Sequence, residues 1–175
     1  MNVDKLLGSK TKAGILKYLI FKRQWVSMRA LENDLQWSFT AIKKQVDSLL
    51  DSEVIIINKN YNKRSISINN DVHLLVKNFF LFSLEFELKK IFEKYPWIVY
   101  NYYLGKIFGK NLDIDIAIIY YPAEDHTLAN LKKEIWEVFM DYFVDSVWVV
   151  FMSLNDFQKR YRLADKFVLN LIRNS

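Results

Sequence analysis

The chain has 175 residues, 51% of them apolar and 16% aromatic, and carries 25 Lys and Arg against 20 Asp and Glu. This composition provides ample material for a packed core and gives little support for disorder. The lack of cysteine excludes disulfides, cysteine zinc sites and thiol nucleophiles. The longest charge-free stretch, 95–105, is too short to span a bilayer, and the first ten residues lack the apolar stretch of a secretion signal. We therefore expect a cytoplasmic globular protein with no membrane partner.

The positive charge is concentrated in residues 1–70, which hold 12 Lys and Arg against 6 Asp and Glu. Residues 71–175 hold 13 Lys and Arg against 14 Asp and Glu. Such an asymmetry is typical of a chain in which one part binds a polyanion. Chance is the other explanation, because six net charges on a small domain are not extreme. The pattern of the elements has to decide between them.

Three helices are predicted in the first part of the chain. A period of 3.6 residues predicts the first helix from about Ser9 to Lys22. Val26 is placed to begin a short strand, and Ser27 is a typical N-cap for a second helix over Met28–Leu35. After a tight turn, Ser38 caps a third helix that runs to about Ser52.

The third helix has two distinct faces. The spacing of its apolar residues predicts a buried stripe of Phe39, Ile42, Val46 and Leu49. The opposite face carries Thr40, Lys43, Lys44 and Asp47. Asp47 lies one turn beyond Lys43, so an intrahelical ion pair between these two is one expectation.

Two strands are predicted next, over 54–58 and 65–69, because the first is β-branched and the second alternates polar and apolar residues. The segment between them, Lys59–Arg64, is rich in Asn, Lys and Arg. The sequence therefore predicts a β-hairpin with a basic tip.

This order of elements resembles the winged helix-turn-helix domains of prokaryotic transcription regulators. The likeness is carried by Ile15-Leu16, the segments 27–31 and 41–46, Leu49-Leu50 and the wing at 59–64. It implies double-stranded DNA as the partner, with the third helix in the major groove and the wing on phosphates or the minor groove. The expected DNA-binding residues are Ser38, Thr40, Lys43, Lys44, Lys59, Asn60, Asn62, Lys63 and Arg64. One alternative is a solvated helix face with a hairpin that its lysines keep soluble, and another is a winged helix that docks proteins.

The second part of the chain is predicted to contain a long helix, a small sheet and further helices. The helix over 72–94 is apolar on more than one face, so we expect its own sheet, the first domain and a second copy of the chain to cover it, and hence a homodimer. The predicted strands are 97–104, 112–121 and 146–152, and the predicted helices are 125–144, 154–162 and 164–173.

Two carboxylates, Asp113 and Asp115, are predicted on one face of the second of these strands, where they could share divalent cations. With Gly105 on the preceding turn, this arrangement resembles the nucleotidyltransferase fold of the polymerase-beta type. The family's Gly-Ser pair is missing, since Lys106 follows Gly105, and alignment puts Trp148 where the family has its third carboxylate. We therefore expect a relic without catalysis and without a resident cofactor. Isolated histidines, His73 and His126, are expected to have capping or surface roles.

We thus expect an α+β chain with a winged-helix DNA-binding domain over 1–70 and a nucleotidyltransferase-like domain over 71–175, which includes the connecting helix 72–94. The expected function is sequence-specific DNA binding by a transcription regulator, in which the second domain serves dimerisation or sensing. The alternative is an active Mg²⁺-dependent nucleotidyltransferase whose winged helix recruits the substrate.

Overall fold

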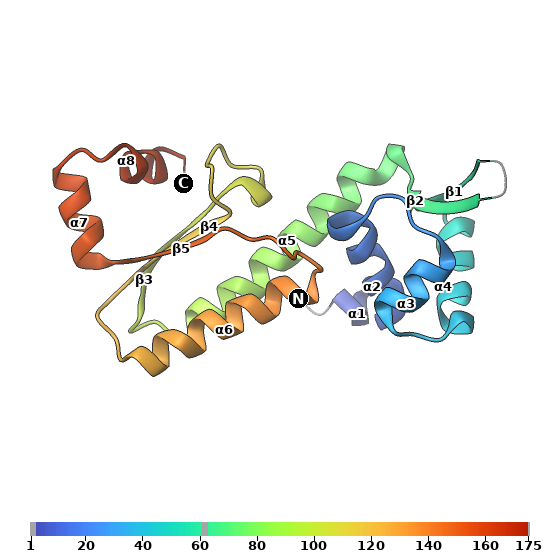
Figure 1. Ribbon diagram of the computed structural model, residues 1–175, viewed down its shortest axis with the longest axis horizontal. Coiled ribbons are helices and arrows are strands. Elements are labelled where there is room, and N and C mark those ends of the chain that lie inside the picture. Colours follow the sequence, from blue (N-terminus) through green and yellow to red (C-terminus); the bar gives the residue numbers. More distant parts are fainter. Residues whose placement is uncertain (1–2, 61–62, 175) are drawn as a thin grey trace. The chain divides into compact units, whose positions relative to one another are not determined.

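The computed structural model describes residues 3–60 and 63–174, with the side chains of residues 59, 60 and 63 outside this description. Helices and two small sheets make an α+β fold in this part of the chain (Figure 1). The chain divides into two compact units, Met1–Leu84 with Met140–Asp145, and Glu85–Phe139 with Ser146–Ser175. No helix among the described residues is both long and apolar enough to cross a membrane.

The first unit begins with helices whose starts are set by serine caps. The helical elements are α1 (Val3–Leu6), α2 (Lys10–Lys17), a π-helical segment (Tyr18–Lys22), α3 (Met28–Leu35) and α4 (Phe39–Asp51). The side chains of Ser9, Ser27 and Ser38 accept hydrogen bonds from the amides three residues on, at 3.2, 3.2 and 3.3 Å. The predicted caps Ser27 and Ser38 are confirmed. The predicted first helix is α2 followed by the π-helical segment.

A hairpin follows α4, made of β1 (Ile55–Asn60) and β2 (Lys63–Ile68), which pair antiparallel with Ile57 opposite Ile66. Val26 bridges to Ile66, with N···O distances of 3.0 and 2.7 Å, so the predicted short strand at Val26 is confirmed. The hairpin lies beside α4 (Figure 1). Its ladder reaches the Asn60–Lys63 pair, so residues 59, 60, 63 and 64, predicted as a tip, are strand residues.

The core of the first unit is formed by apolar residues of its helices and hairpin, among them Ile15, Leu19, Leu31, Ile42, Val46, Leu49, Ile55 and Ile66. The predicted buried stripe of α4 is wrong for one of its residues. Phe39 is 43% exposed, because it is the first residue of α4 and lies on a turn that the rest of the core does not cover.

Residues 140–145 complete the first unit from the far half of the chain. They follow α6 (Asp125–Asp141), which ends three residues before the predicted helix end. Tyr142 is buried, and its hydroxyl lies 2.6 Å from that of Ser83. Phe143 packs edge-on against Tyr18, at 5.6 Å between ring centroids. The first unit also takes residues 70–84 of α5 (Asn70–Lys94), whereas the sequence suggested a boundary at residue 70.

The second unit contains a three-stranded sheet in the order β3 (Val99–Leu104), β4 (Ile116–Tyr120) and β5 (Val149–Ser153). β3 and β4 are antiparallel, and β4 and β5 are parallel and connected through α6. Helices α7 (Leu154–Arg162) and α8 (Lys166–Arg173) follow. The core joins the sheet to α8 through Tyr103, Leu112, Ile114, Ala117, Ile119, Met152, Val168 and Leu171.

All three strands differ from their predicted bounds. β3 begins two residues late because residues 95–98 form a turn, in which the amides of Ile98 and Val99 bond to the carbonyl of Tyr95. β4 begins at Ile116, and residues 113–115 approach it as a bend. The prediction that Asp113 and Asp115 lie on a strand is therefore wrong.

Candidate nucleic-acid interface

The outward face of α4 presents a threonine and two lysines to solvent. Thr40, Lys43 and Lys44 are all exposed. The opposite face of the helix is buried through Ile42, Val46 and Leu49. Neither lysine has a hydrogen bond or ion pair among the residues that the structure describes. Both ammonium groups are therefore available to an anion from outside the unit.

The positive character of this face is confined to the first half of α4. Asp47 and Asp51 are exposed on the second half, and no ion pair joins Asp47 to Lys43 among the described residues. The positive end of the helix dipole adds positive character at the N-terminus of α4, one turn before the lysines. Ser38 lies at the same end, where its oxygen accepts from the Ala41 amide at 3.3 Å and its hydroxyl hydrogen can still be donated.

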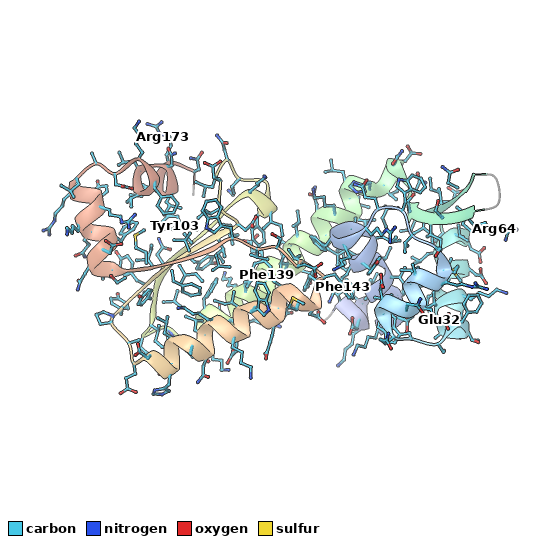
Figure 2. The ribbon with its side chains drawn as sticks, viewed as in Figure 1. Glu32, Arg64, Tyr103, Phe139, Phe143 and Arg173 are labelled. Atoms are coloured by element: carbon cyan, nitrogen blue, oxygen red, sulfur yellow. The ribbon has the colours of Figure 1, made fainter. Side chains whose placement is uncertain are left out.

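The hairpin adds cations beside α4. Arg64 is exposed, and its side chain projects outward from β2 (Figure 2). It pairs across the ladder with Lys59, and Asn60 pairs with Lys63. Asn62 lies outside the described residues.

Two cations of the N-terminal part are neutralised within the first unit. Lys17, with a side chain only 9% exposed, pairs with Asp141 and lies 4.1 Å from the ring centroid of Tyr142. Lys22 pairs with Asp145. The unit as a whole holds 13 Lys and Arg against 9 Asp and Glu, a net charge of +4, and the second unit has +1. The excess stays in the first unit, although it is smaller than residues 1–70 suggest.

One exposed cation of the first unit was not among the DNA-binding residues predicted from the sequence. Arg29 is exposed in the first turn of α3, two residues after the cap Ser27. It has no partner among the described residues. Its position, in the first turn after a serine cap, corresponds to that of Thr40 on α4, and this parallel was the signal that could have identified it.

The residues of the predicted carboxylate site meet through the backbone. The Gly105 amide bonds to the Asp115 carbonyl at 2.8 Å, and the Asp115 amide bonds to the Trp148 carbonyl at 3.0 Å. The Asp115 carboxylate accepts from the Trp148 amide at 2.8 Å, whereas Asp113 is exposed. Asp115 therefore holds the segment that leads into β5. Among the described residues, no three His, Cys, Asp or Glu gather as a metal site would need.

Comparisons with protein families, with curated proteins and with solved structures find no match for this chain. What the chain does is inferred from its own residues and their positions.

Proposed function

We propose that the chain binds double-stranded DNA in a sequence-specific manner through α4 and the hairpin, and that it acts as a transcription regulator. The observation that carries the proposal is the free face of α4. Thr40, Lys43 and Lys44 project from a helix whose other side is held by the core. Because the core holds the buried face of α4, the direction of its exposed face is fixed as well. The side chains proposed to contact base edges therefore have a defined geometry.

The order of elements supports the proposal. Two helices joined by the turn at Gln36, which has a positive φ of 55°, are followed by a hairpin that pairs with Val26. This order and pairing resemble a winged helix-turn-helix. An α-helix fits the major groove of B-DNA, where its side chains reach base edges.

The two parts of the surface take different roles. Thr40, Lys43 and Lys44 face base edges, because they stand on the helix that enters the groove. The cations at 59, 63 and 64 bind phosphates, and the amides at 60 and 62 add neutral donors. Ser38 and Arg29, each at the start of a helix, contact the phosphate backbone.

The second unit is proposed as a nucleotidyltransferase-like scaffold without catalysis. Its order of helix, two antiparallel strands, helix and parallel strand supports the likeness. The engagement of Asp115 with Trp148 supports a structural role for that carboxylate. Incubation with labelled nucleoside triphosphates and Mg²⁺ tests the point. Transfer that is lost in Asp113→Ala would favour the enzymatic alternative.

Selection of bound duplexes from a random pool tests the proposed function. We expect one enriched sequence, with binding that weakens steeply as salt rises because phosphate contacts release counterions. Enrichment of no sequence, together with no retardation of duplex DNA at low salt, would instead favour a protein-docking module.

A further inference from the structure

Helix α5 carries an apolar stripe, most of which the described residues leave exposed. Its residues Leu75, Phe79, Phe82 and Phe86 follow one another at spacings of four, three and four. Leu75 is 72% exposed, Phe82 60% and Phe86 39%. Alternating spacings of three and four put side chains on one seam of a helix, as in coiled coils. Phe79 packs edge-on against Phe80 at 5.2 Å between ring centroids, and the Lys90 ammonium lies 4.8 Å from the ring centroid of Phe86. Among the described residues, Leu75 and Phe82 therefore form the most exposed part of the seam.

A groove runs beside the stripe within the first unit. It has a volume of about 720 Å³ and is lined mainly by apolar side chains, including Leu6, Leu16, Leu49, Val54, Leu75 and Phe79. Leu6, which lines the groove, is 63% exposed. A surface that combines a groove with protruding Leu and Phe side chains can be complementary to itself, as a twofold interface requires.

The size of the surface fits a second copy of the chain. A stable interface buries about 800 Å² per partner, of which about 60% is apolar, or roughly 500 Å². Leu6, Leu75, Phe82 and Phe86, 39–72% exposed, offer on the order of 400 Å² before the groove walls are counted. Together with the groove walls, this area comes near what a dimer needs.

We propose that α5 pairs with α5 of a second copy, antiparallel, about a twofold axis near residues 80 and 81. In this register Leu75 meets Phe86 of the partner subunit, and Phe79 meets Phe82 of the partner subunit. Every member of the stripe then has an apolar partner, and each seam position packs against the complementary position of the other helix.

Charges at the ends of α5 select the antiparallel orientation. Asp71 lies at the start of the helix, and Lys89 and Lys90 lie near its end. The antiparallel register brings Asp71 alongside Lys90 of the partner subunit, at a site where Lys90 also reaches its own Glu87 at 3.2 Å. A parallel pair would place each of these charges beside its own copy and would repel.

The proposed dimer is independent of the proposed DNA binding. Its test measures the oligomeric state of the full chain without DNA, so a failure of one proposal does not count against the other. Sedimentation equilibrium is expected to give a dimer with a micromolar or lower dissociation constant. Leu75→Glu and Phe82→Glu, tested singly, should each weaken it at least about 30-fold. Leu163→Glu is the matched control, since Leu163 is also 72% exposed but lies after α7. It should leave the dimer intact, and circular dichroism checks that every variant is folded.

Engineered cysteines test the orientation directly, because the chain has none of its own. A mixture of Leu75→Cys and Phe86→Cys chains should form a disulfide between the two variants, and Leu75→Cys alone should not cross-link. A wild-type chain that stays monomeric at tens of micromolar overturns the proposal and leaves the surface to another occupant. Dimers unaffected by both glutamates, or cross-linking of Leu75→Cys alone, overturn it as well.

Discussion

At Gly105 the backbone passes so close to residue 114 that no side chain fits. A Cβ placed there would lie 1.9 Å from the carbonyl oxygen of Ile114. Gly105→Ala is therefore expected to lower the free energy of unfolding of the second unit by at least about 2 kcal/mol, because backbone must move. Urea denaturation measures the change.

The matched variant is Gly14→Ala. There the new Cβ would meet the ring of Trp37 at 2.2 Å, which is the far end of a side chain that can turn away. The better helix propensity of Ala offsets part of the remaining clash, so a smaller loss is expected. If Gly105→Ala matched the wild type in stability, the close approach at residue 114 would be refuted.

Tyr18 gives the first unit a dependence on alkaline pH. Burial, and next the hydrogen bond to Asp34, raise the pKa of Tyr18 from 10.0 to about 12. The stabilisation is complete below pH 10 and is lost as the pH rises through 12, because the unfolded phenol ionises first. We expect the melting temperature to fall over this range less steeply in Tyr18→Phe. If the melting temperatures of the wild type and Tyr18→Phe fell equally steeply with pH, the raised pKa of Tyr18 would be contradicted.

At the scale of elements, the capping serine of α4 separates stability from binding. Ser38→Ala removes the bond to the Ala41 amide and should cost about 1 kcal/mol of unfolding free energy. Ser38→Asp caps equally well, so it should keep the stability while its charge weakens duplex binding by repelling phosphates. Denaturation and a DNA-binding titration of both variants check this. If Ser38→Asp bound duplex DNA as tightly as the wild type, Ser38 would not contact the DNA phosphate backbone.

Elements with strong local signals were predictable. Met28–Leu35 is found as predicted, since serine caps and a 3.6-residue period act within the helix itself. The exposed face of α4 follows from the same period. The exposure of Phe39 was not predictable, because it depends on which turns of α4 the rest of the core covers. The late start of β4 and the early end of α6 depend on contacts with distant segments, those of Asp115 with Trp148 and of Tyr142 with Ser83. The pairing of Lys17 with Asp141, 124 residues away, has no local signal at all.

At the scale of the whole molecule, residues 140–145 make the first unit discontinuous. A fragment of residues 1–84 lacks the partners of Lys17 and Ser83, both buried. We expect it to lose at least about 2 kcal/mol of unfolding free energy relative to the same fragment joined through a Gly-Ser linker to residues 140–145. Equal denaturation midpoints for the two fragments would show that the segment is dispensable.

The central claim is that the face of α4 reads a DNA sequence, and one binding ratio tests it. The measurement is the affinity for a selected duplex divided by that for a scrambled duplex of equal length, at fixed salt. In Lys43→Ala/Lys44→Ala the ratio should fall at least about tenfold, towards one. The control Lys132→Ala/Lys133→Ala, another exposed lysine pair, should keep the wild-type ratio. An unchanged ratio in the α4 variant would contradict the account.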